Sequence, residues 1–235
     1  MKKQEFKEGI INGLPICFGY LSVSFAFGMM AKANGLPTWI AVLISMSNVT
    51  SAGQLAGLNM IVAQGAYLEI ALTTLIINLR YSLMSLSLSQ KMPDDISQAQ
   101  RMMISFGITD EIFAVAIERK SKFTPSYFAG LILIPYVGWA VGTFLGAAAT
   151  QLMTPAIASA LGIAIYGMFI AIIIPPCVEV KAIRYVLCWS ISLSFLFRYL
   201  PLLNRLSSGW AIIIITLIAS FLTALKYPVE VEHHE

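Results

Sequence analysis

Apolar stretches separated by short polar turns follow one another along most of the chain. Stretches of about 18 or more mostly apolar residues are long enough to cross a bilayer as a helix, and their repetition is typical of polytopic helical membrane proteins. We therefore predict an all-α integral membrane protein with seven to eight membrane segments, some of them kinked or broken. The expected segments are 10–30, 38–62, 67–90, 125–152, 156–174, 182–200 and 209–225, with 98–118 as a further helix.

Irregular backbone is expected in two of these segments. Pro15 lies inside segment 10–30, where it removes a backbone donor and favours a kink or a break. The second half of segment 38–62 is rich in small and polar residues between Ser45 and Asn59. Either this helix packs closely on its neighbours, or its backbone unwinds to line a cavity.

Segment 67–90 carries Asn78 and Arg80 near its middle. A guanidinium group stays charged in a protein, and placing it at the centre of a bilayer costs roughly 3 kcal/mol on insertion scales. Arg80 therefore requires an acidic partner or a watery cavity. The same helix carries a polar stripe at three- and four-residue spacing, made of Thr74, Asn78, either Tyr81 or Ser82, Ser85 and Ser89.

Segment 98–118 contains two adjacent acidic residues, Asp110 and Glu111. On a helix, Asp110 shares its face with Phe106 and Phe113, so it lies on the more apolar side. Burial disfavours a charged carboxylate unless a cation is near, and Arg80 is the evident cation at membrane depth. The two side chains either pair to hold two helices together or form a polar site.

The distribution of Lys and Arg limits the topology. If segment 38–62 crosses the membrane and 98–118 does not, the basic 91–124 region lies opposite the basic N-terminus. Either 98–118 also crosses, which we favour because it brings Asp110 to the depth of Arg80, or 38–62 is re-entrant. Both solutions leave the two chain ends on the cytoplasmic side of the cell membrane.

Composition narrows the class further. The chain is 58% hydrophobic and 11% charged, with a mean hydropathy of +0.79, and it has no long polar segment. We therefore expect one transmembrane domain, 1–235, with a short polar tail, 226–235. The first segment is too long and its flank too acidic for a signal peptide, so we expect it to be retained. No basic stripe suggests nucleic-acid binding.

Residue chemistry argues against an enzyme or a metalloprotein. The three cysteines, Cys17, Cys177 and Cys188, form no CxxC motif, and His233 and His234 both lie in the tail. We expect no catalytic residues, no cofactor and no metal site. A chain without a GxxxxGK[ST] motif is also not expected to use ATP by itself.

Three glycines in segment 125–152 recur at four-residue spacing. This pattern lets two helix backbones approach closely. The second backbone is either another helix of this chain or a helix of a partner subunit. The glycines are Gly138, Gly142 and Gly146.

Several short motifs together resemble the AzlC family of membrane proteins. They extend over roughly residues 8–200 and include an Asn-x-Arg element, in which Tyr81 stands where His is usual, and a Thr-Asp-Glu element. The residues that carry the resemblance are Glu8-Gly9, Leu14-Pro15, Phe25–Gly28, Ala52–Gln54, Asn78–Tyr81, Phe106–Ala114 and Gly142–Gly146.

This resemblance implies the large subunit of a branched-chain amino-acid exporter that works with a small AzlD-like membrane subunit. An amino acid is a zwitterion, so its carrier needs a cation, an acceptor for the ammonium group and an apolar pocket. We assign Arg80 to the carboxylate and Asp110 to the ammonium group or to a counter-moving proton, with Glu111 as the second candidate acid. Neutral hydrogen bonds would come from Asn78, Gln54 and Thr109. The alternatives are a channel or a structural subunit for another small solute.

Overall fold

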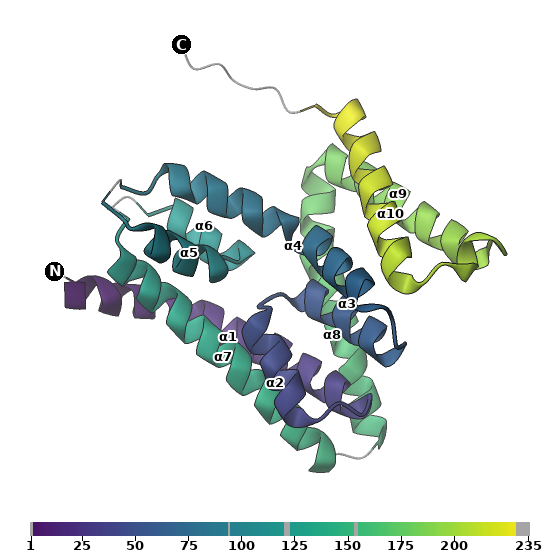
Figure 1. The fold of residues 1–235 in the computed structure, drawn as a ribbon, viewed down its shortest axis with the longest axis horizontal. Helices are drawn as coiled ribbons and strands as arrows, with labels where there is room; N and C mark the ends of the chain where they lie inside the picture. The colour runs from purple at the N-terminus through teal and green to yellow at the C-terminus, as the bar shows by residue number, and fades with distance from the viewer. Residues whose placement is uncertain (1, 94, 120–122, 153–154, 229–235) are drawn as a thin grey trace. The chain divides into compact units, whose positions relative to one another are not determined.

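The computed structural model describes residues 2–93, 95–119, 123–152 and 155–228, and these residues form helices and no strands (Figure 1). The predicted all-α fold is therefore confirmed. The helices are α1 Lys2–Ala33, α2 Thr38–Ser47, α3 Ser51–Val62, α4 Tyr67–Gln90, α5 Gln98–Phe106, α6 Asp110–Ile117, α7 Pro125–Ala149, α8 Pro155–Glu179, α9 Lys181–Tyr199 and α10 Ser208–Lys226, with 3-10 turns at Thr150–Leu152 and Leu203–Arg205.

The chain divides into two compact units. The first consists of Met1–Leu58 and Ile77–Ile165, and the second of Asn59–Ile76 and Tyr166–Glu235. Helix α4 begins in the second unit and continues into the first. The expected polar tail lies largely outside the described residues, since α10 extends to Lys226 and residues 229–235, with both histidines, are not described.

The number of continuous membrane helices is smaller than predicted. Among the described residues, four helices are long and apolar enough to cross a membrane, namely α1, α4, α7 and α10. The expected segments 38–62 and 98–118 are each split into two short helices, and α9 is less apolar because it contains Arg184 and Arg198. In α8, Phe169–Glu179 forms only a shorter apolar stretch. The membrane-protein class stands, but the count of seven to eight is corrected.

Both split segments are interrupted in the same way. Three residues separate α2 from α3, and three separate α5 from α6. In each case a threonine closes the gap by capping the next helix: the Thr50 hydroxyl accepts from the Gly53 amide at 3.4 Å, and the Thr109 hydroxyl from the Ile112 amide at 3.3 Å. We call 48–50 the first break and 107–109 the second break. Segment 38–62 is thus unwound in its middle, one of the two outcomes expected for it.

The prolines do not interrupt the helices that contain them. Helix α1 passes through Pro15 without a break, and α8 continues through Pro175 and Pro176 to Glu179. The expected break at Pro15 and the expected end of segment 156–174 are therefore wrong. A proline removes one backbone donor, and the long contact of α1 with α7 supports the helix on both sides of it.

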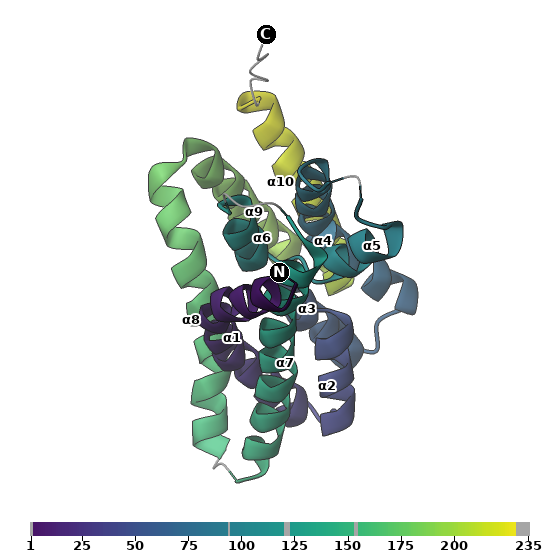
Figure 2. The same ribbon diagram turned by 90° about the vertical axis from the view of Figure 1, so that its left-hand side faces the viewer.

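Helices α1 and α7 lie side by side along most of their length (Figures 1 and 2). Glycines allow this approach from α1: Gly9 faces the backbone of Tyr127, Gly13 that of Leu131, and Gly28 that of Thr143. From α7, Gly138 faces Cys17, Gly142 faces Leu21 and Ser24, and Gly146 faces Phe25. The predicted glycine stripe therefore packs against a helix of the same chain.

The residue numbers of both helices increase together along this contact, so α1 and α7 run parallel. If α1, α4 and α7 all cross the membrane, two parallel helices require an odd number of crossings between them. The two broken segments then either both cross or both turn back. This excludes the arrangement in which 38–62 crosses and 98–118 does not. The orientation of the chain ends stays a prediction.

The α1–α7 pair also supports the second break. Tyr127, Phe128 and Leu131 of α7 are buried in one apolar cluster with Ile104 and Ile112, which lie on either side of that break. Close van der Waals packing of this kind stabilises contacts between helices in a membrane. Helices α5 and α6 therefore both pack against α7, and this packing determines where residue 110 lies.

We predict that Gly142→Ala lowers the free energy of unfolding by about 1–3 kcal/mol, because its Cβ would meet the Leu21 carbonyl and the Ser24 hydroxyl. The control is Gly19→Ala in α1, where a Cβ meets nothing within 4 Å. Thermal unfolding of the purified protein in detergent compares the two. Equal stability of both variants would contradict the close α1–α7 contact.

Candidate functional site

Arg80 and Asp110 form an ion pair in the first unit. The Arg80 Nη1 atom lies 2.8 Å from Asp110 Oδ2, and the two side chains are 46% and 40% exposed. The Arg80 guanidinium also donates to the Tyr81 hydroxyl at 3.1 Å and lies 4.8 Å from the centre of that ring. The cation in the middle of α4 therefore has an acidic partner, and the pair is open enough for a third group to reach it.

Asp110 owes its position to the second break. It is the first residue of α6, directly after the Thr109 cap, where the positive end of the helix dipole favours a carboxylate. The Tyr20 hydroxyl of α1 lies 2.5 Å from Thr109 Oγ1 and 2.6 Å from Glu111 Oε2. Glu111 therefore contacts a tyrosine hydroxyl, whereas Asp110 contacts the cation.

The first break reaches the same part of α4. Asn48, the first residue of that break, accepts a hydrogen bond of 2.9 Å from the Asn78 Nδ2 atom. Two residues further along α4, Arg80 holds Asp110 at the end of the second break. The short stretch 78–80 thus binds Asn48 of the first break and Asp110, the residue that follows the second break, which makes it the centre of the site.

Gln54 belongs to a buried chain of hydrogen bonds next to the first break. Its Nε2 atom donates to Ser45 Oγ at 2.8 Å, Ser45 Oγ lies 2.7 Å from Thr143 Oγ1, and Thr143 donates to the Trp139 carbonyl at 3.1 Å. Either hydroxyl of the Ser45–Thr143 pair can be the donor to the other. The Nε2 atom of Gln54 faces Ser45, and Oε1 lies at the other end of the amide.

Two amide oxygens of this region are buried and have no partner among the described residues, Gln54 Oε1 and Asn78 Oδ1. Gln54 is only 1% exposed. Leaving a buried acceptor unpaired costs about 1–3 kcal/mol. A donor from water or from a ligand would remove that cost, so both oxygens are candidate contacts for a bound molecule.

A polar groove follows the stripe of α4 away from this centre. It has a volume of about 690 Å³ and lies between α4 and α5. Arg101 of α5 closes its far end, where it donates to the Ser89 carbonyl at 3.0 Å and to the Pro93 carbonyl at 2.8 Å. The polar residues that line the groove beside Arg101 are Asn78, Tyr81, Ser82, Ser85, Ser89, Gln98 and Ser105.

Of the six residues predicted to bind substrate or a proton, the structure brings four together, while Gln54 and Glu111 bond to other partners. Arg80, Asp110, Asn78 and Thr109 lie on or beside the two breaks. The described hydrogen bond of Gln54 goes instead to Ser45. Sequence reasoning missed Tyr20, Ser45 and Thr143, because single hydroxyl groups in apolar helices form no periodic pattern.

Glu69 was also missed, and it belongs to the second unit. It is 5% exposed, and its Oε1 accepts from the Ser207 hydroxyl at 2.5 Å and from the Gly209 amide at 2.8 Å. This carboxylate therefore caps the first turn of α10. The described residues contain no group of three His, Cys, Asp or Glu side chains arranged to hold a metal ion.

Comparisons with known proteins agree on the class. The family model described as AzlC protein matches residues 15–153, which include both breaks and Arg80. The chain is 27% identical over 176 residues to the "Inner membrane protein YgaZ" of Escherichia coli, covering 72% of each chain. It is 29% identical over 176 residues to an "Uncharacterized membrane protein" of Archaeoglobus fulgidus, covering 74% of this chain and 77% of that one. No solved structure matches it.

We predict that Thr109→Val destabilises the start of α6 by about 1–2 kcal/mol, because valine cannot accept from the Ile112 amide. Thr109→Ser keeps the hydroxyl and serves as the control. Hydrogen exchange followed by mass spectrometry should show faster exchange in peptides that contain residues 110–113 of the valine variant only. Unchanged protection in that variant would show that the cap does not hold the second break.

Proposed function

Because this chain belongs to the AzlC family, we propose that it is the large subunit of a secondary transporter that exports branched-chain or similar small hydrophobic amino acids. The family and the membrane proteins among its relatives support a transporter-type membrane protein rather than an enzyme. The proposal adds the substrate class, the coupling to protons and a small AzlD-like partner subunit. Its location would be the cell membrane, with both chain ends cytoplasmic.

The open ion pair is the observation that carries this proposal. A purely structural pair in a membrane is expected to be closed off, but Arg80 and Asp110 are each nearly half exposed. A zwitterion offers one charge to each of them. Arg80 can bind the carboxylate with two parallel hydrogen bonds, and Asp110 can accept the ammonium group. Substrate thus replaces the internal pair without leaving a charge unpaired.

Neutral groups around the pair complete the substrate site. The free Asn78 Oδ1 atom lies on the same helix two residues from Arg80 and can accept from the ammonium group. Thr109 keeps Asp110 in place. Gln54 Oε1 is a buried acceptor close to the first break, in the separate hydrogen-bond chain with Ser45. The serine-lined groove between α4 and α5 gives the polar end of an amino acid a path along α4.

The same arrangement supports coupling to protons. If a substrate carboxylate occupies Arg80 while no ammonium group contacts Asp110, Asp110 has no cationic partner, and a carboxylate without a cation at membrane depth favours protonation. Asp110 would then carry either the ammonium contact or a proton, but not both. Glu111, with its bond to Tyr20, is the second candidate for holding the proton.

The contact with a small partner subunit is expected away from the glycine stripe. Gly138, Gly142 and Gly146 face α1 of the same chain, so that surface is already occupied. Other helices expose apolar side chains, for example Leu75 and Leu83 of α4, and these can contact either lipid or another subunit.

We predict that Arg80→Lys and Asp110→Asn each reduce leucine export about tenfold or more, because lysine loses the two-pronged contact and asparagine loses the charge. Export is measured as efflux from preloaded vesicles that contain this chain and its small partner. Arg119→Lys is the matched control, since Arg119 also forms an ion pair, with Glu8 at 3.0 Å.

The exchanged variant Arg80→Asp with Asp110→Arg separates transport from a structural role. It restores an ion pair but reverses its polarity relative to Asn78 and Thr109, so we expect normal protein levels without normal export. Full export by the exchanged variant would leave the pair a structural role only. Efflux that neither saturates with leucine nor distinguishes its enantiomers would indicate a channel instead.

A further inference from the structure

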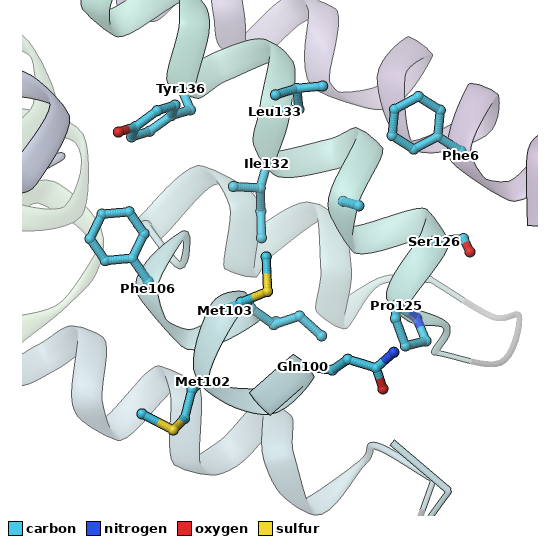
Figure 3. A pocket seen from close by; sticks show the side chains of 12 residues that line it. Phe6, Gln100, Met102, Met103, Phe106, Pro125, Ser126, Ile132, Leu133 and Tyr136 are labelled. Atoms are coloured by element: carbon cyan, nitrogen blue, oxygen red, sulfur yellow. The ribbon is translucent and has the colours of Figure 1, made fainter. Parts of the chain in front are cut away.

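An apolar pocket lies on the opposite side of α5 from the polar groove. It has a volume of about 850 Å³ and is formed by α5, α7 and the start of α1. Figure 3 shows side chains from α5 and α7 facing each other across it, including Met103, Phe106, Ile132 and Tyr136. None of its lining residues is charged. The volume falls in the range of roughly 300–1,000 Å³ that is usual for small-molecule sites.

Two side chains of α5 form the wall between this pocket and the polar groove. Met102 and Phe106 line both of them. Phe106 is also the last residue of α5, and Asp110 is the first residue of α6. Tyr81, whose hydroxyl accepts a hydrogen bond from Arg80, lines the polar groove together with Phe106, so the groove connects the ion pair with the wall of the apolar pocket.

Residues of the back wall of the pocket contact residues in or beside both breaks. The ring of Phe106 packs edge-on against Tyr136, with 6.2 Å between ring centres. The Tyr136 hydroxyl donates to the Met46 carbonyl at 2.9 Å, just before the first break. Gly107, at the start of the second break, lies so close to Ile132 that a Cβ there would overlap its side chain. The shape of the pocket therefore depends on the position of the breaks.

The front of the pocket is adaptable. Met102 and Met103 are unbranched side chains that can follow ligands of different shape. A polar groove, an ion pair and an uncharged pocket thus lie next to one another in the first unit. An amino acid with an aliphatic side chain likewise joins charged groups to an uncharged one.

We propose that this pocket receives the aliphatic side chain of the exported amino acid, and that Phe106 and Tyr136 set the size of side chain accepted. This inference rests on the proposed export function. The aliphatic chain enters past Met102 and Phe106 while the charged end stays at Arg80 and Asp110. The volume of the pocket then determines which amino acids are accepted, whereas Arg80 and Asp110 recognise the charged groups that all amino acids share.

The test compares export ratios for alanine, leucine and phenylalanine in vesicles with wild-type chain and its Phe106 variants. Phe106→Trp fills the pocket and should lower the leucine-to-alanine ratio about tenfold. Phe106→Ala enlarges the pocket and should raise the phenylalanine-to-leucine ratio by a similar factor. Phe18→Ala and Phe18→Trp are the controls, since Phe18 is an exposed aromatic residue of α1, 69% exposed against 58% for Phe106.

Ratios cancel differences in protein level, and Met103→Trp, which also fills the pocket, replaces Phe106→Trp if that variant does not fold. Unchanged ratios in a chain that exports leucine would overturn the pocket assignment and leave the export function standing. The same holds if the variants change only the lipid that copurifies, because an acyl chain would then be the occupant. A wild-type chain that exports none of the three amino acids would instead refute the export function itself.

Discussion

A permanent positive charge inside an apolar helix is the constraint on which this structure depends. Arg80 cannot lose its proton, and α4 is among the helices long and apolar enough to cross a membrane. Asp110 compensates this charge, since its Oδ2 atom lies 2.8 Å from Arg80 Nη1. To place that carboxylate the chain interrupts a helix at 107–109, so that Asp110 begins a new helix whose dipole favours its charge.

The rest of the first unit keeps this arrangement in place. Parallel helices α1 and α7 pack through glycines along their length, and their shared apolar cluster fixes α5 and α6. Two similar breaks are packed near this pair, and in each a threonine caps the helix that follows. Stretch 78–80 of α4 binds Asn48 of the first break and Asp110, which follows the second break. The structure thus combines a closely packed helix pair with two interrupted helices.

Much of the site could be predicted because charge in an apolar segment is a strong signal. The need of Arg80 for an acid and the polar stripe of α4 follow from side-chain chemistry and helix periodicity. The expected helix face shared by Phe106 and Asp110 is wrong, because the helix is interrupted at 107–109 and Asp110 begins α6. Composition could not show where helices break, because Pro15 lies in a continuous helix while the Asn48–Thr50 gap contains no proline. It also could not predict the hydrogen bonds of Tyr20 and Glu69, because their partners are distant in sequence and are brought near by packing alone.

The free energy of unfolding of four proteins tests the central claim most directly: wild type, Arg80→Met, Asp110→Asn and the double variant, each in lipid bilayers. Removing one partner leaves an uncompensated charge at membrane depth, whereas removing both does not. We predict that the double variant loses less free energy of unfolding than the two single variants lose together, and that the difference is about 1 kcal/mol or more. Losses that add within about 0.5 kcal/mol would show that the two charges do not stabilise each other.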